Sequence, residues 1–206
     1  MQSPITFILI GITAVVSWLA FNNRKLADRL ILWPPAIARN KQFDRLLTYG
    51  FIHADFSHLL FNMLTLFFFG RYIEQVMGMI SGSALTFPLF YLSALVVSIL
   101  PTYLKNRHNP NYLSLGASGA VSAVVFAFIL LSPWSLIFVF FVPLPAIVYA
   151  VLYVGYSIWM DKKGGDRINH SAHLAGAAYG VLFMLIMQPK VLGHFLEQLS
   201  RPTFGL

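Results

Sequence analysis

Long apolar runs alternate with short polar segments along most of the chain. Crossing the hydrocarbon core of a bilayer takes about 20 predominantly apolar residues, and several runs approach that length without long polar insertions between them. The pattern predicts six helices, at residues 4–21, 48–70, 82–104, 116–131, 144–160 and 169–187. We therefore expect an all-α membrane protein, a six-transmembrane-helix bundle that forms one domain over residues 1–206.

Charge and local signals decide how the runs are divided. Residues 109–160 carry no formal charge, which is too long for one crossing and suits two, with prolines at 133, 143 and 145 marking the reversal. No positively charged segment precedes the first run, and no small-residue cleavage site follows it. Residues 1–21 are therefore interpreted as a retained span and not as a signal peptide.

The composition supports a membrane location and excludes several kinds of chemistry. Hydrophobic residues make up 58% of the chain and charged residues only 10%, which lies outside the usual balance of soluble domains. Cysteine is absent, so disulfides, thiolate zinc sites and cysteine nucleophiles are excluded. The net charge of +7 comes from short loops without a basic helix or a base-reading motif. We therefore expect membrane lipids, and no nucleic acid, as partners of these charges.

Polar residues lie near the start of alternate predicted helices. In a chain that crosses the membrane six times, the second, fourth and sixth helices start on the same side. His58 and Asn62 lie early in the second helix. Ser118 lies early in the fourth and His173 early in the sixth. Because polar side chains are costly at membrane depth, they normally face the bundle interior or a water-filled cavity. These four residues therefore define a candidate site.

Small residues predict close packing between the fourth and sixth helices. Each helix has a face of small side chains that permits close approach, formed by Gly119, Ala123 and Ala127 and by Gly176 and Gly180. Ser118 begins the first face and His173 shares the second. Packing of the two faces would bring the serine hydroxyl within reach of the imidazole that must take its proton.

The remaining polar residues suggest a dyad with oxyanion donors. His58 and Asn62 are four residues apart on one helix face, where they offer hydrogen-bond donors to a developing oxyanion, and the backbone N–H of Ser118 adds another. Most acidic residues fall in loops, in the tail or at the opposite helix end, so we expect a Ser–His dyad instead of a triad. Asp55, which precedes an apolar helix, is interpreted as an N-terminal cap.

Three motifs together resemble the rhomboid family of intramembrane serine proteases. They are the HxxxN pattern of residues 58–62, the GxSG pattern of residues 116–119 and the AHxxGxxxG pattern of residues 172–180, in this order on the second, fourth and sixth helices. The resemblance implies that Ser118 is the nucleophile and His173 the base, and that His58 and Asn62 line the oxyanion hole. It also implies a rhomboid-like bundle with a water-filled cavity, transmembrane proteins as substrates, and access from the lipid near the fifth helix.

The chain departs from the family pattern at two places. Residues 43–45 read Phe-Asp-Arg where the family often has Trp-Arg in the first loop, which affects how this loop docks. Ser122 stands where an aromatic residue often lies four positions after the serine, so the ring that supports His173 is left open. The candidates are Tyr112, Tyr149, Tyr153 and Tyr179.

Two other functions stay open as alternatives. A metal-dependent membrane hydrolase would surround an ion with His53, His58, His170 and His173, but the chain has no HExxH motif and no His–carboxylate pair on a helix. A catalytically silent rhomboid-like membrane binding protein would keep the fold, yet Ser118 and His173 are both present. We therefore expect a serine endopeptidase without metal or cofactor, in which His53 and His170 are structural or line the rim.

The orientation in the membrane is predicted from two opposing signals. Eleven of the Lys and Arg residues lie in loops on the candidate-site side and three on the other side, so the positive-inside rule would turn the site toward the cytoplasm. The resemblance implies an outward-facing site, as in bacterial relatives. We follow the resemblance, because residues 30–33 are apolar and place the basic first loop in the headgroup region. The prediction is a multi-pass protein of the bacterial inner membrane with its site facing outward.

Overall fold

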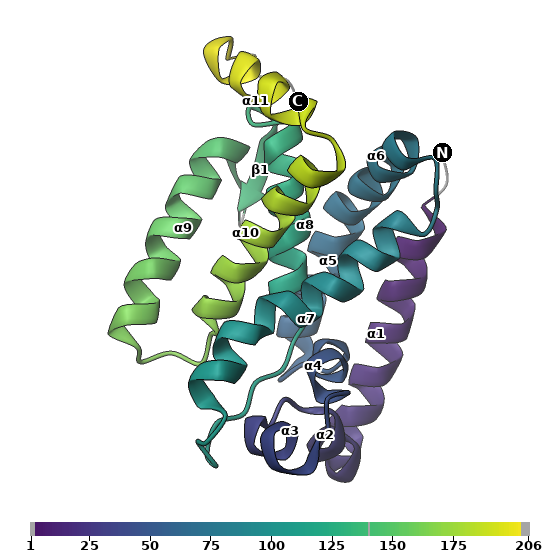
Figure 1. Cartoon of the computed structure of the whole chain (residues 1–206), viewed down its shortest axis with the longest axis vertical. Helices are drawn as coiled ribbons and strands as arrows, with labels where there is room; N and C mark the ends of the chain where they lie inside the picture. Colours follow the sequence, from purple (N-terminus) through teal and green to yellow (C-terminus); the bar gives the residue numbers. More distant parts are fainter. Residues whose placement is uncertain (1–2, 140, 203–206) are drawn as a thin grey trace.

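The protein is a helical bundle with one small hairpin (Figure 1). The computed structural model describes residues 3–139 and 141–202, and the predicted domain of residues 1–206 extends to positions 1–2, 140 and 203–206 outside them. In chain order the elements are α1 (Pro4–Asn22), α2 (Arg24–Leu30), α3 (Pro34–Asn40), α4 (Arg45–Thr48), the 3-10 turn η1 (Tyr49–Phe51), α5 (Phe56–Thr65), the π-helical segment η2 (Leu66–Gly70), α6 (Arg71–Ser81), α7 (Thr86–Asn106), α8 (Ser118–Leu131), β1 (Leu136–Val139), β2 (Val142–Pro145), α9 (Ala146–Lys163), α10 (His170–Met187) and α11 (Lys190–Ser200).

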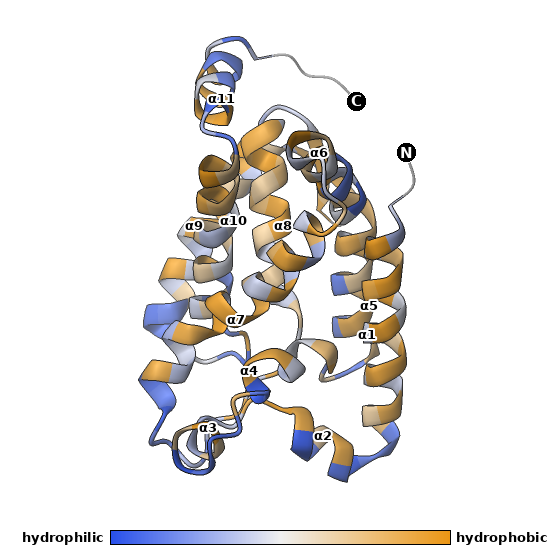
Figure 2. Cartoon of the chain, turned by 45° about the vertical axis from the view of Figure 1, so that its right-hand side comes forward, coloured by the Kyte–Doolittle hydropathy of each residue, from blue (hydrophilic) through white to orange (hydrophobic). Residues whose placement is uncertain are grey.

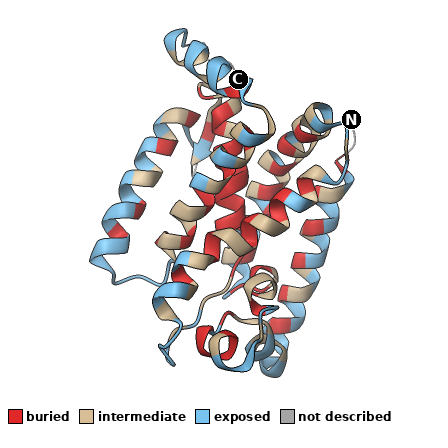
Figure 3. Cartoon of the chain, in the orientation of Figure 1, coloured by how far each residue is buried: buried red, intermediate tan, exposed pale blue. Residues whose placement is uncertain are grey.

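Helix α8 forms the centre of the bundle. Eleven of its fourteen residues are buried, and Figure 3 shows this helix as the buried column behind α7 and α10. Within the described residues, α8 packs with the continuous segment α5–η2–α6, α7, α9, α10 and α11. The predicted all-α bundle of six membrane helices is confirmed.

The outer surface of the bundle is apolar, as a lipid environment requires. Helix α1 exposes large side chains such as Phe7, Ile8 and Trp18, and Figure 2 shows its outer face as strongly hydrophobic. By length and composition, α1, α7 and α10 can each cross a membrane. The two helical segments of residues 45–51 and 56–81, which are bent relative to each other, add a fourth crossing if they are taken together as one span. With a rise of 1.5 Å per residue, α8 is only about 21 Å long, less than the ~30 Å hydrocarbon core. The central helix therefore starts or ends below the membrane surface.

The second helix differs most from its predicted boundaries. The expected start near Thr48 is wrong, because the helix begins at Phe56, where the Asp55 carboxylate accepts a hydrogen bond from the His58 N–H at 2.7 Å. Residues 45–51 form short helices bent by 96° from the segment that follows. The expected end at Gly70 is also wrong, since the helix continues through the π-helical segment η2 to Ser81.

The second helix continues past Gly70 although it carries the charged residue Glu74, because the Glu74 carboxylate has hydrogen-bond partners on α1. This carboxylate accepts hydrogen bonds from the backbone N–H groups of Ile5 and Thr6, at 3.0 and 2.8 Å, and from the Thr6 hydroxyl at 2.6 Å. The charged side chain thus satisfies the free donors at the N-terminus of α1. The other five helices begin and end within four residues of the predicted bounds. The hairpin β1–β2 and helix α11 were not predicted.

The predicted contact between the fourth and sixth helices is confirmed as a backbone-to-backbone approach. A side-chain carbon added at Gly176 would overlap the carbonyl group of Gly119, and one at Gly180 would overlap that of Ala123. Only glycine leaves room for this spacing, as is common where membrane helices meet through small residues. The approach of α8 and α10 therefore depends on these two positions.

Replacing Gly180 with alanine tests this contact. The added methyl group would push α10 away from the Ala123 carbonyl, and we expect Gly180→Ala to lower the free energy of unfolding by about 1–3 kcal/mol. The measurement is thermal or denaturant unfolding in detergent micelles. Gly155→Ala is the matched control, because nothing lies within 4 Å of the added carbon. This control should be neutral or slightly stabilising, and equal losses in both variants would contradict the packing argument.

Candidate active site

Ser118 is the first residue of α8, and long-range hydrogen bonds fix the segment that leads into it. The backbone of Ser114 pairs with that of Leu32 in an antiparallel bridge, with N–O distances of 3.0 and 3.2 Å. Gly116 N–H donates to the Tyr49 carbonyl at 3.0 Å, and the Tyr49 hydroxyl donates to the carbonyl of Leu95 in α7 at 2.7 Å. The chain before Ser118 is therefore held by elements from the first loop and from α7.

The first loop docks through a buried arginine. Arg45 is 6% exposed, and its guanidinium donates to the carbonyls of Asp28 and Ile31 at 2.9 and 2.6 Å and to the Gln42 side chain at 2.6 Å. Arg45 thus docks this loop although residues 43–45 read Phe-Asp-Arg where the family often has Trp-Arg. The loop carries Leu32, so its docking also supports the segment before Ser118.

His173 lies in the first turns of α10 with its ring directed at Ser118. The distance between His173 Nε2 and Ser118 Oγ is 2.7 Å. When the hydroxyl donates to Nε2, the proton of the neutral imidazole is on Nδ1. Asn169 caps α10 by accepting from Ala172 N–H at 3.0 Å, and the same oxygen accepts from Thr102 at 2.9 Å. The start of α10 is thereby fixed to α7.

His53 supports the residue before the serine and is almost completely buried. Its Nε2 accepts from Ala117 N–H at 3.4 Å, which leaves the proton on Nδ1 to be donated to Ser17 Oγ at 3.0 Å. Ser17 in turn donates to the Phe51 carbonyl at 3.0 Å. Sequence reasoning interpreted His53 as structural but missed Ser17, a single hydroxyl in an apolar helix. A polar residue in such a run is the signal that would have identified it.

The structure brings His58 close to the serine segment, and Asn62 lies one turn further along α5. The His58 ring lies against Gly116, where a side-chain carbon would be 2.6 Å from its Cε1 atom. Asn62 is buried, and its amide donates to the His58 carbonyl at 2.9 Å. An amide group has a second N–H proton, so Asn62 retains a donor in this arrangement.

Tyr153 of α9 is the ring that stacks on His173. The two ring centroids are 6.0 Å apart with an interplanar angle of 20°. The Tyr153 hydroxyl lies 2.6 Å from Ser122 Oγ, and Ser122 donates to the Ser118 carbonyl at 2.8 Å. Tyr179, another of the four candidates, instead stacks on Phe90. The serine that replaces the usual aromatic residue on α8 is therefore bonded to a tyrosine supplied by α9.

One polar contact joins the end of α9 to α10, and another joins the connection between these helices to the start of α10. Asp161 accepts from the Ser171 hydroxyl at 2.6 Å, and Asp166 lies 3.0 Å from His170 Nε2. The hydrogen bond from His170 holds the pKa of the Asp166 carboxyl below its usual range. His170 is buried, as expected for a structural residue. In the described part of the chain, no three His, Asp or Glu side chains gather in a group that could hold a metal ion.

The fold and the site define an integral membrane protein whose helices enclose a serine and a histidine. Residues 40–190 match the Rhomboid domain, and the chain belongs to the rhomboid family. It is 29% identical to RHOMBOID-like protein 12, mitochondrial, of Arabidopsis thaliana, over 81% of this chain and 53% of that protein. It is also 29% identical to the rhomboid YdcA of Bacillus subtilis (strain 168), over 57% of each, and 32% identical to RHOMBOID-like protein 4 of Arabidopsis thaliana, over 70% of this chain and 34% of that protein. The chain spans about half the length or less of these curated relatives.

Gly116→Ala tests the contact between the serine segment and His58. Gly116 has a φ of +113°, which strains any other residue by about 1–3 kcal/mol. Gly165 has a φ of +104° but no neighbour within 4 Å, so Gly165→Ala controls for the backbone strain alone. We expect Gly116→Ala to lose about 1–3 kcal/mol more than Gly165→Ala, because it also displaces the His58 ring. Unfolding in detergent measures both, and equal losses would mean that the ring moves away freely.

Proposed function

We propose that this rhomboid is an intramembrane serine endopeptidase that cleaves transmembrane segments of membrane proteins. Ser118 is the nucleophile and His173 the general base. The observation that carries the proposal is the 2.7 Å contact between His173 Nε2 and Ser118 Oγ inside a membrane bundle. Membership of the rhomboid family supports this function.

The proposed reaction needs only these two residues and water. Ser118 Oγ attacks the scissile carbonyl carbon while its proton passes to His173 Nε2, which gives a tetrahedral intermediate. The intermediate then breaks the C–N bond, and the leaving amine takes the proton from His173. A water molecule, deprotonated by His173, next attacks the acyl-enzyme, and Ser118 regains its proton when the new carboxyl terminus leaves. No cofactor takes part in these steps.

Donors for the oxyanion come from α8 and α5. The first N–H groups of a helix have no acceptor within the helix, and Ser118 begins α8, so its N–H is the first proposed donor. His58 lies beside Gly116, and the free N–H proton of the Asn62 amide completes the proposed oxyanion hole. The proposal places the start of the short helix α8, with Ser118, below the membrane surface, so hydrolysis requires a water-filled approach from the loop side.

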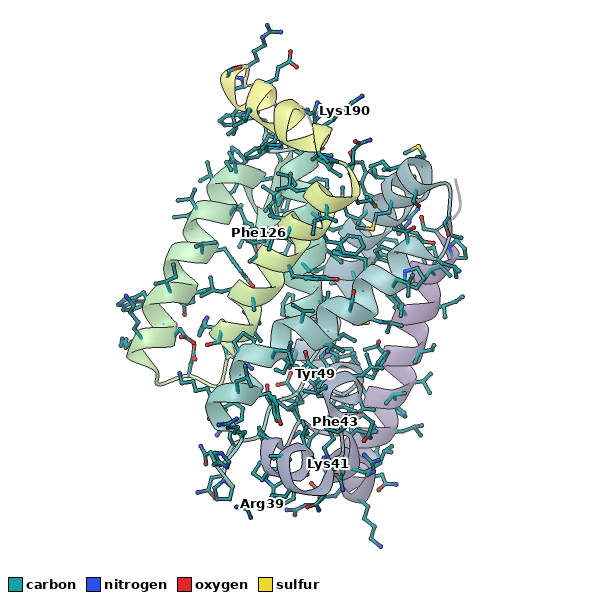
Figure 4. The ribbon with its side chains drawn as sticks, viewed as in Figure 1. Arg39, Lys41, Phe43, Tyr49, Phe126 and Lys190 are labelled. Carbon is teal, nitrogen blue, oxygen red and sulfur yellow. The ribbon has the colours of Figure 1, made fainter. Side chains whose placement is uncertain are left out.

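The proposed location is the bacterial inner membrane with the site facing outward. The start of α1 and helix α11 lie at the end of the bundle opposite to the first loop (Figure 1). Figure 4 shows the basic side chains Arg39 and Lys41 at the site end and Lys190 at the other. The relatives include a bacterial and a mitochondrial protein, so a mitochondrial membrane is the alternative.

Substitution of the proposed dyad tests the function. Purified protein in detergent is incubated with a transmembrane peptide, and we expect Ser118→Ala and His173→Ala each to lower kcat by about 10⁴-fold or more. His194→Ala is the control, because this histidine lies on α11 with its ring bonded to Gln198. A chelator should leave the native rate unchanged.

Other outcomes separate the alternatives. In the same assay, Asn62→Ala should lower kcat by about 10²–10³-fold through loss of an oxyanion donor. Full cleavage by Ser118→Ala would refute the serine mechanism. Inhibition by chelator would favour a metal-dependent hydrolase. Native protein that neither cleaves the peptide nor reacts with a fluorophosphonate would indicate a catalytically silent binding protein.

The absence of cysteine gives a direct test of orientation. Lys25→Cys places a single thiol in the first loop, and Lys190→Cys places one at the opposite end. With the protein in the inner membrane of bacterial spheroplasts, a membrane-impermeant maleimide should label Lys25→Cys at once and Lys190→Cys only after lysis. The reverse pattern would turn the site toward the cytoplasm, as the distribution of basic residues suggests.

A further inference from the structure

We infer that Tyr153 positions the imidazole of His173 from α9, so that the base is held in place only while α9 lies against α8 and α10. This inference rests on the proposed function of His173. It adds a positioning residue to the reaction and couples the position of one helix to the state of the base.

Three groups surround the His173 ring, each from a different helix. Ser118 of α8 bonds to Nε2, His170 of α10 meets the ring edge-to-face at a centroid distance of 6.0 Å, and Tyr153 of α9 stacks on its face. An imidazole turns about two side-chain torsions, and a single hydrogen bond does not fix both. The stacked Tyr153 ring restricts the second torsion, which sets the direction of Nε2 toward Ser118.

A chain of hydrogen bonds ties Tyr153 to the proposed nucleophile. Ser122 donates its proton to the Ser118 carbonyl, so the Tyr153 hydroxyl must donate to Ser122. The tyrosine is therefore fixed to α8 one turn after Ser118 and stacked on α10. One residue of α9 thus contacts both helices that carry the proposed dyad.

Helix α9 has little buried surface to hold it in place. Its buried residues are Ala146, Ala150, Ser157 and Met160, and three of these four have small side chains. Its large apolar side chains face outward, including Val148, Val151, Leu152, Ile158 and Trp159. Figure 3 shows α9 at the edge of the bundle and mostly exposed. Elements with few buried contacts open at the lowest free-energy cost.

Movement of α9 therefore acts directly on the base. When the middle of α9 moves outward, the Tyr153 ring leaves the face of His173, and the bond to Ser122 breaks. The imidazole then loses one of its three contacts while Ser118 stays in place on α8. The dyad is fully aligned only when α9 has returned to the bundle.

The first test compares two substitutions of Tyr153. Tyr153→Phe keeps the stacked ring and should change kcat only slightly, whereas Tyr153→Leu removes it and should lower kcat by about 10–100-fold with KM little changed. Trp159→Leu is the control on the same helix, because Trp159 is half exposed and its ring meets Tyr156 and neither His170 nor His173. Equal rates for Tyr153→Leu and native protein, with comparable unfolding temperatures, would overturn the inference.

The second test measures the coupling to α9. Asp161→Ala removes the bond to Ser171 and loosens α9 without touching Tyr153. We expect it to slow the reaction of Ser118 with a small fluorophosphonate several-fold in the native background and to have no further effect in Tyr153→Leu. If Tyr153 had no role, a looser α9 would admit the probe more easily and the rate would rise or stay constant. Equal slowing in both backgrounds would also overturn the coupling.

A third variant moves the ring from α9 to α8. The double substitution Ser122→Tyr with Tyr153→Leu places the aromatic residue on α8, and recovery of kcat over Tyr153→Leu alone would show that the ring and not the fold was lost. Failure to recover, in a variant that unfolds at the native temperature, counts against a positioning role. These comparisons are made with a native protein that is active. A negative result would therefore overturn the role of Tyr153 and leave the proposed function, which Ser118→Ala tests, unaffected.

Discussion

The close approach of α8 and α10 is the constraint on which the rest of the structure depends. The backbone of Gly176 and Gly180 contacts the carbonyl groups of Gly119 and Ala123, and no larger side chain fits between them. In lipid the hydrophobic effect does not drive helices together, so tight packing and polar contacts must hold them. The same spacing sets the 2.7 Å distance between Ser118 and His173. The stability of the bundle and the proposed chemistry therefore both depend on the contact between α8 and α10.

Long-range polar contacts complete the site where the helix pair cannot. Residues 107–117 have no regular structure of their own to direct Ser118. Leu32 of the first loop and Tyr49 of η1 hold this segment through backbone bonds, and His53 holds it through its ring Nε2. Arg45 holds the first loop in turn. Buried polar groups without partners are costly at membrane depth. Each of these bonds therefore satisfies a buried group and also fixes the position of the serine.

The bundle combines a rigid centre with a loosely attached edge. Helix α8 is buried on nearly all sides, whereas α9 is mostly exposed and contributes one tyrosine to the site. Under the proposed function the site must admit a transmembrane segment, which needs an element that moves at low cost. Placing the support of the imidazole on that element, and not on the rigid α8, connects the movement to the chemistry.

The chain's own pattern was enough to predict the number of membrane helices, the side on which the polar residues gather and the packing of Gly176 and Gly180 on α8. These features are readable from the sequence because the length of an apolar run and the spacing of small residues are properties of a single helix or of one pair of helices. The start of the second helix at Phe56 and its continuation to Ser81 were not predictable in this way. They depend on whether a carboxylate finds hydrogen-bond partners. Asp55 finds one within its own turn, and Glu74 finds its partners on α1, about 70 residues away.

The partner of His173 was likewise left open among four tyrosines, since ring stacking depends on how α9 turns against α10. Only the folded arrangement of the helices selects Tyr153, because that contact joins residues with no shared sequence pattern.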